Sequence, residues 1–302
     1  MTEDEKAPVN AEPGRAAPLA HANQLRGTAF KALLRRRKTW LWILGIALPA
    51  LALFSLAGAW FIGLPVAALV VLFGILVAFW IADRRAEDAF YDSYCETHGL
   101  TRVEGQELGM WTPLLRKGDE RDTKEIFRGE LAPGITGEIA LWTYTEVSHD
   151  SKGNRQETNY PFTLVHVVLP TTVEHLPELR VQNKAGFKFL EGLEDKFRAK
   201  HERVTLESEA MRDRYEIFVL KGQDPVWVRR LFSPSFIVWL VEKPPKRFAF
   251  ELEDGHFVAY VPKHRDDVAG LELVTTFGTQ IAARLLEEVA QTSPRADRET
   301  AQ

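Results

Sequence analysis

Residues 39–82 read TWLWILGIALPALALFSLAGAWFIGLPVAALVVLFGILVAFWIA, and these 44 residues contain no Asp, Glu, Lys, Arg or His. As one α-helix the run would be about 66 Å long, against about 30 Å for the hydrocarbon core of a bilayer. The run therefore predicts a transmembrane hairpin with spans over 39–57 and 66–82. Gly58 and Gly63 are expected to break the first helix, and Pro65 suits the first turn of the second.

Basic residues flank the run on both sides. Residues 24–38 contain six Lys or Arg, Arg84 and Arg85 follow the second span, and the connecting turn contains none. Because cytoplasmic loops are enriched in Lys and Arg, the pattern predicts a multi-pass protein of the inner (cytoplasmic) membrane with both termini cytoplasmic. A signal peptide cleaved at residues 57–59 is the competing interpretation. The long charged leader and the second span argue against it.

Residues 1–38 are predicted to be a disordered basic leader. Their first part contains Pro8, Pro13 and Pro18 and few large apolar side chains, so it cannot offset the entropy of ordering. Between 24 and 38 the apolar residues fall roughly on one helical face. That pattern suits a surface helix among anionic lipid headgroups, although a plain charged stop beside a membrane span is favoured.

Residues 83–290 are predicted to form a cytoplasmic α+β domain, followed by a disordered tail, 291–302. From residue 83 onward the chain has 30 basic and 38 acidic residues, an acidic balance that argues against a nucleic-acid partner. The only cysteine, Cys95, excludes an internal disulfide and a cysteine-based zinc site.

The expected fold class is α+β, a mainly antiparallel sheet with helices packed on one face. Apolar residues alternate on both sides of the tight-turn pair Asp254-Gly255 and predict a hairpin over 247–261. A second hairpin is expected to join strands at 135–147 and 160–169 through a polar loop, 149–158. Further strands are expected at 179–182, 204–206 and 215–220, and helices at 86–98, 110–116, 186–200 and 269–291. One or two helices are expected over 224–242, interrupted at Ser233-Pro234.

Part of this domain resembles a bacterial family of membrane-anchored proteins of unknown function. The matching stretch, 203–262, contains the strand Tyr215–Val219, then Asp224, then the segment 229–236 with Ser233-Pro234, and finally the 248–261 hairpin. This chain has Val228 and Ser233 where the family pattern has Ala and Thr. The resemblance implies membrane-anchoring helices ahead of an α+β domain, and it implies no activity.

Cys95 and His98 lie three residues apart on an expected helix and could share a metal or form a nucleophile pair. Two ligands are too few for a metal site, so an unrelated thiol and imidazole are favoured. His166 lies within an apolar strand, where a hydrogen-bonded core histidine is the usual case. Arg229 and Arg230 could bind an anion, but exposed helical arginines are favoured.

His264, Asp266 and Asp267 could suggest acid–base or metal chemistry. They precede the last helix, where an aspartate that caps the helix is the preferred interpretation. The acidic residues Glu125, Glu130 and Glu138 could form a carboxylate set, but solvated charges are more common. Ser233-Pro234 is expected to begin a helix, with the Ser233 hydroxyl capping it and Pro234 in its first turn.

No common nucleotide-binding, hydrolase or metalloprotease motif occurs in the sequence. No catalytic, cofactor-binding or metal-binding residue is therefore predicted, and an enzyme is disfavoured. The leading hypothesis is a membrane-tethered domain that binds a protein partner, a lipid headgroup or a second copy of itself. Two alternatives stay open: a membrane-bound enzyme with an unrecognised site, and a PH-like lipid or protein sensor.

Overall fold

The computed structural model of the protein describes residues 60–174, 176, 178–184, 200–223 and 225–292, together with Gly45 and Pro49. The predicted leader, almost all of the first span, the helix expected at 186–200 apart from its last residue, and the tail beyond Thr292 lie outside the described residues. The chain divides into two compact units, Met1–Tyr94 and Cys95–Gln302.

Helix α3, Trp60–His98, accounts for nearly all of the described part of the first unit. The expectation that Pro65 lies in the first turn is wrong, because the helix begins at Trp60 and encloses Pro65. A glycine such as Gly63 costs a helix only about 1 kcal/mol, which is too little to end it. The second predicted span, 66–82, lies within this helix, and among the described residues no helix is both long enough and apolar enough to cross a membrane.

Helix α3 ends at His98, where the sequence predicts the end of the helix at 86–98, and Gly99 follows it. Its φ is +65°, the left-handed conformation that glycine adopts at helix ends. The Leu100 amide donates to the Cys95 carbonyl at 2.8 Å, and the Gly99 amide donates to the Glu96 carbonyl at 3.5 Å. These two bonds satisfy carbonyl groups that the end of the helix would otherwise leave without a donor.

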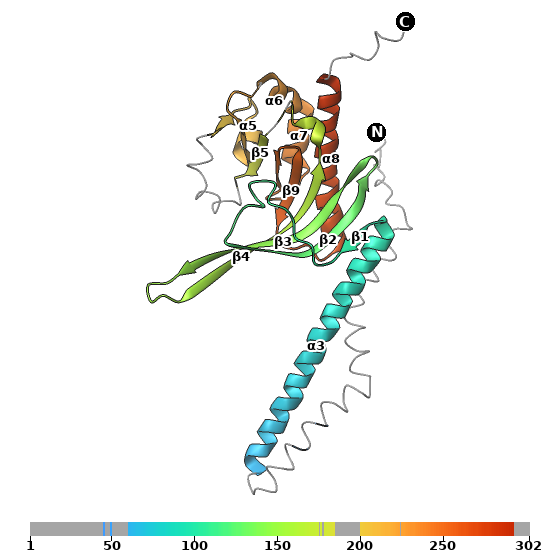
Figure 1. The fold of residues 1–302 in the computed structure, drawn as a ribbon, viewed down its shortest axis with the longest axis vertical. Helices are drawn as coiled ribbons and strands as arrows, with labels where there is room; N and C mark the ends of the chain where they lie inside the picture. The colour runs from blue at the N-terminus through green and yellow to red at the C-terminus, as the bar shows by residue number, and fades with distance from the viewer. Residues whose placement is uncertain are drawn as a thin grey trace, which may run out of the picture. The chain divides into compact units, whose positions relative to one another are not determined.

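In the described residues, the second unit contains a nine-stranded sheet in the order β1-β2-β3-β4-β9-β8-β5-β7-β6 (Figure 1). All of its pairings are antiparallel, which confirms the predicted antiparallel sheet of an α+β domain. The strands are β1 Thr101–Val103, β2 Glu120–Ala132, β3 Ile135–His149, β4 Arg155–Val168, β5 Glu178–Asn183, β6 His201–Val204, β7 Tyr215–Leu220, β8 Ala249–Glu253 and β9 His256–Pro262.

The β8–β9 hairpin forms as predicted, with Asp254 and Gly255 at φ values of 48° and 78°. Two positive φ values are what a tight hairpin turn requires. Strands β3, β4, β5 and β7 also lie close to where the sequence predicts them. Strand β6 lies at His201–Val204, ahead of its predicted place at 204–206, and strands β1 and β2 were not predicted.

The loop expected at 149–158 is also wrong. Pairing between β3 and β4 continues as far as His149 opposite Arg155, and only residues 150–154 form the turn. Figure 1 shows the end of this hairpin projecting from the rest of the sheet. The Asp150 carboxylate accepts the amides of Lys152 and Asn154, each at 2.8 Å, so this turn is held by its own side chain.

One face of the sheet carries the helices. They are α5 Glu209–Arg214, α6 Pro225–Leu231, α7 Pro234–Glu242 and α8 Val268–Thr292, with a short 3₁₀ turn at Pro170–Thr172. Helix α8 contacts β2, β3, β4 and β9, and α6 packs on α8. Gly278 allows the close approach, because a Cβ there would lie 3.1 Å from the Cβ of Val165 on β4.

The central part of the opposite face is covered by residues 104–119, here called the covering segment. Its expected helix at 110–116 is wrong: the segment forms turns, with the Arg116 amide donating to the Thr112 carbonyl at 3.2 Å. Leu114 and Leu115 are buried against a core on the sheet that includes Trp142, Phe162 and Tyr260. The segment follows a path that buries its apolar side chains against the sheet. A regular helix there would expose some of these side chains to water.

Two helix starts offer a matched test of capping. The Asp267 carboxylate accepts the Gly270 amide at 2.8 Å, which confirms the predicted cap. Ser233 precedes α7, with Pro234 in the first turn, but its hydroxyl makes no capping bond and lies 3.4 Å from Arg284 instead.

Asp267→Ala should therefore lower the free energy of unfolding by about 0.5–2 kcal/mol, and Ser233→Ala by less than about 0.5 kcal/mol. Denaturant titration of the two variants measures both values. Equal losses would contradict the assignment.

Candidate functional site

The structure separates most of the residues that the sequence singled out. His98 lies 3.2 Å from Glu272 of α8, and Cys95 is a buried thiol. His264 lies 3.1 Å from the Thr143 hydroxyl. Arg230 lies 3.7 Å from Glu288, so it belongs to an ion pair between helices α6 and α8. These contacts are structural.

The three glutamates do not form a carboxylate set. Glu125 is paired with Arg102 through two bonds of 2.6 and 2.7 Å, and Glu130 accepts the Gly134 amide at 2.8 Å. Glu138 differs from them, because it lies on the covered face of the sheet beside a histidine. That face contains two groups of polar side chains.

The first group is the histidine row, defined as Glu138 on β3, His166 on β4 and His256 on β9. The three residues lie on adjacent strands, with Glu138 directly opposite His166. The Nε2 atom of His166 lies 3.0 Å from the Nδ1 atom of His256, a hydrogen-bond distance. The Nδ1 atom of His166 lies 3.9 Å from Glu138, which is too long for a hydrogen bond but close enough for an ion pair.

Trp111 of the covering segment lies flat over both imidazoles. Its ring centroid is 4.1 Å from that of His166 and 5.0 Å from that of His256, with interplanar angles of 15° and 4°. His166 is only 2 % exposed, whereas His256 is partly exposed. Solvent therefore reaches the row at His256, and the indole shields His166.

The surroundings lower the pKa values of Glu138 and of His256, for different reasons. The adjacent His166 imidazole, helped by Arg128 at 3.2 Å, holds the pKa of Glu138 below its ordinary value. Burial, and then the neighbouring His166, lower the pKa of His256. Glu138 is thus kept as a carboxylate, and His256 favours its neutral form. The row thus places a carboxylate beside two imidazoles that are joined at hydrogen-bond distance.

The second group is a buried charge cluster formed by Arg180 on β5, Glu251 on β8 and Lys117 of the covering segment. Glu251 is fully buried, accepts the Leu114 amide at 2.7 Å and lies 3.8 Å from Arg180. Burial raises the pKa of Glu251. Burial, and then the nearby Arg180, lower the pKa of Lys117 to about 8. The cluster ties the covering segment to the sheet.

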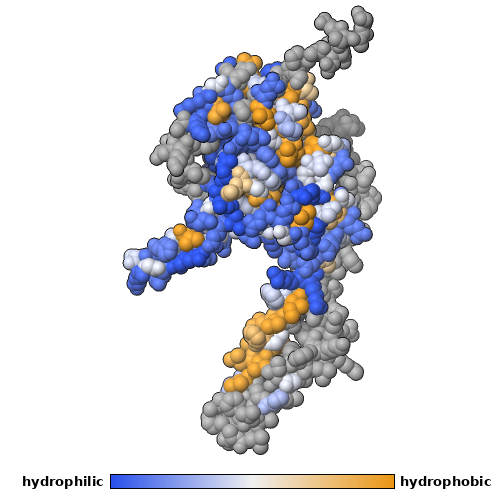
Figure 2. Space-filling model, viewed as in Figure 1, coloured by the Kyte–Doolittle hydropathy of each residue, from blue (hydrophilic) through white to orange (hydrophobic). Residues whose placement is uncertain are grey.

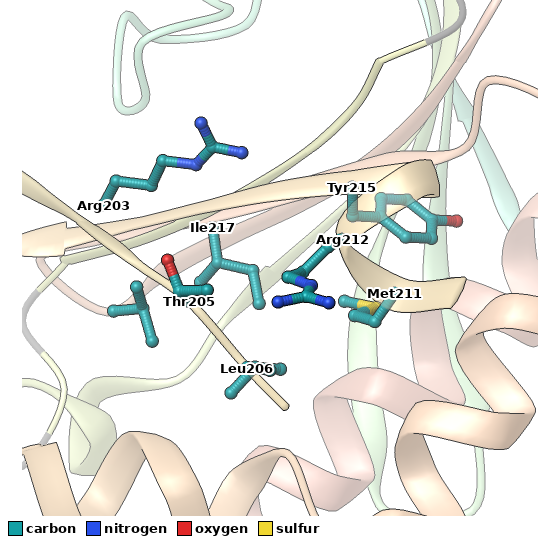
Figure 3. A pocket seen from close by; sticks show the side chains of 8 residues that line it. Arg203, Thr205, Leu206, Met211, Arg212, Tyr215 and Ile217 are labelled. Atoms are coloured by element: carbon teal, nitrogen blue, oxygen red, sulfur yellow. The ribbon is translucent and has the colours of Figure 1, made fainter. Parts of the chain in front are cut away.

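Two hollows lie on the side of the α-helices. Figure 3 shows the smaller, lined by residues that include Thr205, Met211 and Ile217; its volume is about 10 Å³, room for about one water molecule. The larger is an open groove of about 510 Å³ lined by residues 205–208 together with Arg229, Phe232, Pro234, Ile237 and Val238. The groove has the size of a site for a small molecule or a short peptide.

In the described part of the chain, no three His, Cys, Asp or Glu side chains converge in a way that could hold a metal ion. The row itself offers only two imidazoles. Sequence reasoning treated His166 as a hydrogen-bonded core histidine, which the structure confirms, and did not single out His256 or Trp111. The sequence signal that could have identified His256 is the alternation of side-chain direction along β9. This alternation places His256 on the same face of the sheet as Tyr260.

Comparison of the chain with models of protein families, with curated proteins and with solved structures gives no match.

Proposed function

We propose that the protein is an inner-membrane protein whose cytoplasmic α+β domain is a non-enzymatic binding or scaffold module. Residues 39–82 would anchor it as a two-span hairpin with both termini cytoplasmic. The anchoring arrangement is the one that the resemblance to membrane-anchored bacterial proteins implies. The proposal rests on the uncharged run and on one observation from helix α3.

That observation is a stripe of exposed apolar side chains on α3. Its members are Leu69, Leu72, Phe73, Leu76, Val77 and Trp80. They recur every three or four residues, so they share one side of the helix, and Figure 2 shows hydrophobic residues gathered along it. Such a stripe is unfavourable in water, and lipid tails would cover it.

The end of the stripe has the chemistry of a membrane boundary. The Arg84 guanidinium lies 5.1 Å from the centre of the Trp80 ring. A tryptophan paired with an arginine suits the level of the headgroups, where the ring meets hydrocarbon and the cation meets phosphate. This contact supports an interface near residues 80–84.

A binding role is favoured over catalysis by the state of the polar groups on the covered face. Glu251 is buried, and Trp111 lies over His166, so a substrate has no route to either residue. The open groove at residues 205–208 and α7 provides accessible space for part of a partner. A membrane-bound enzyme is the second candidate, because a carboxylate beside two linked imidazoles is also an arrangement that moves protons.

The membrane anchor can be tested with the double variant Leu72→Lys/Phe73→Lys. Each lysine near the middle of a span costs about 2.5–3.5 kcal/mol of insertion free energy. Because either span alone could anchor the protein, the variant is combined with Leu48→Lys/Leu51→Lys in the first span, and the four lysines together should release most of the protein from the membrane. Alkaline extraction of membranes, followed by immunoblotting of the pellet and the supernatant, measures the released fraction.

The matched control is Val226→Lys/Val238→Lys, which replaces two exposed valines of helices α6 and α7. It should stay in the membrane pellet with the wild type. A reporter enzyme that is active only outside the cytoplasm, fused after Gln302, should be silent if both termini are cytoplasmic. Extraction of the wild type would overturn the anchor, and an active reporter would overturn the orientation.

A further inference from the structure

Among the contacts that join the covering segment to its face of the sheet, three lie in the middle of the segment and involve polar or aromatic groups. The Leu114 amide bonds to Glu251, Arg116 lies 2.5 Å from Glu253, and Trp111 stacks on the two imidazoles. The first contact joins a backbone amide to a carboxylate, and the second joins an arginine to a carboxylate. The third rests on histidines, the side chains that ordinarily change charge between about pH 5 and pH 8.

The short distance between the two imidazoles limits how many protons the pair can hold. At 3.0 Å one ring must donate and the other must accept, so His166 and His256 share one N–H between the facing nitrogens. A first added proton is compatible with this arrangement, because an imidazolium can donate to a neutral ring. A second added proton places two N–H groups and two positive charges face to face. The hydrogen bond is then lost and the rings repel each other.

Charged groups from every neighbouring element face the row. Arg128 on β2 and Glu138 on β3 lie at the His166 end. At the His256 end, Glu253 on β8 is opposite His256 in the ladder and is paired with Arg116, and Asp254 of the turn acts on His256. Desolvation, and then the neighbouring His166, oppose a proton on His256.

We propose that the histidine row is a pH latch that holds the covering segment closed over the sheet. While at most one extra proton is present, the paired rings form a flat seat for Trp111. The second proton separates the rings and removes that seat. The covering segment then loosens and exposes the sheet face that contains Arg180 and Glu251.

The sign of the effect follows from the two states of His256. In the open state its pKa returns to the ordinary value of 6.5, and in the closed state burial and His166 lower it. The closed state is therefore favoured above pH 6.5 and is weakened as the pH falls below that value. Uptake of one proton on opening makes the opening constant rise about tenfold for each pH unit in this window.

Hydrogen exchange of the full-length protein in detergent micelles measures opening directly. After correction for the intrinsic exchange rate, amides of the covering segment should lose about tenfold protection per pH unit between about pH 6.5 and pH 5. The Leu108 amide, which bonds to the Thr123 hydroxyl, and the Leu114 amide report on the segment. Amides of the β8–β9 hairpin are the internal reference, and their protection should change little.

The decisive variant is His256→Gln, which removes the second titrating ring at a partly exposed position. Protection of the covering segment should then be independent of pH in this window. The matched control is His149→Gln, the same exchange on the exposed end of β3, which should keep the wild-type slope. A wild-type segment without a pH slope, or a slope that survives in His256→Gln, would overturn the latch. Equal loss in the reference hairpin would show global unfolding and would also overturn it.

Discussion

Glu251→Ala should lower the free energy of unfolding of the domain by about 3–5 kcal/mol, the largest effect expected of any single substitution in the buried charge cluster. Glu251 is fully buried, and its carboxylate lies between the Leu114 amide and Arg180. Without it, Arg180 is left as a buried cation beside Lys117, and the Leu114 amide loses its acceptor. Denaturant unfolding of the full-length protein in micelles, followed by tryptophan fluorescence, measures the loss.

The matched control is Glu216→Ala, which removes a half-exposed carboxylate 3.2 Å from Arg203 on the same sheet. Exposed ion pairs contribute about 0–1 kcal/mol, so this variant should remain close to the wild type. The double variant Glu251→Ala/Arg180→Met should recover part of the stability lost in Glu251→Ala, because it also removes one of the two buried positive charges of the cluster. Similar losses in Glu216→Ala and Glu251→Ala would contradict the role given to burial.

Leu114→Ala should lower the free energy of unfolding by about 2–5 kcal/mol, although it lies in a segment without helix or strand. Leu114 is 1 % exposed and belongs to the core that the covering segment forms with the sheet. Truncation removes buried surface and leaves a cavity that the flanking turns cannot easily fill. The same unfolding titration measures this variant.

Met110→Ala is the control within the same segment, since Met110 is 59 % exposed. Its expected loss is below about 0.5 kcal/mol. If both substitutions had small effects, the covering segment would be a loosely attached loop. The core described here would then stop at the surface of the sheet.

The strands that the sequence predicts correctly are those in which one face is apolar. The alternation of Phe248, Phe250 and Leu252 around the Asp254-Gly255 turn locates the β8–β9 hairpin, because burial of one face and the turn chemistry agree. The end of helix α3 at Gly99 and the helix cap at Asp267 depend only on the backbone conformation and hydrogen bonds of neighbouring residues. Both features can therefore also be predicted from the sequence. Local signals of this kind transfer directly from sequence to structure.

The sequence predicts only part of the candidate site. His166 could be identified as a core histidine, but its neighbour His256 lies 90 positions away in sequence and meets it through pairing of β4 with β9. Trp111 could not be placed, because the covering segment has no periodic pattern and folds onto the sheet through scattered leucines. Strand order, which brings these residues together, is not encoded by any local pattern.

Strand β2 was missed because its first half, Glu120–Glu125, is charged at five of six positions. That half extends beyond β1, which pairs only with residues 126–128, so within the described part of the chain its outer edge has no neighbouring strand. Charges at such a position repel a second chain that would otherwise add itself to the ladder. The other edge is β6, only four residues long, with Glu202 and Arg203 at its centre. The charged composition of β2, which kept the sequence from predicting a strand there, therefore also opposes the addition of a second copy of the protein to the edge of this long sheet. It thereby opposes the growth of fibres.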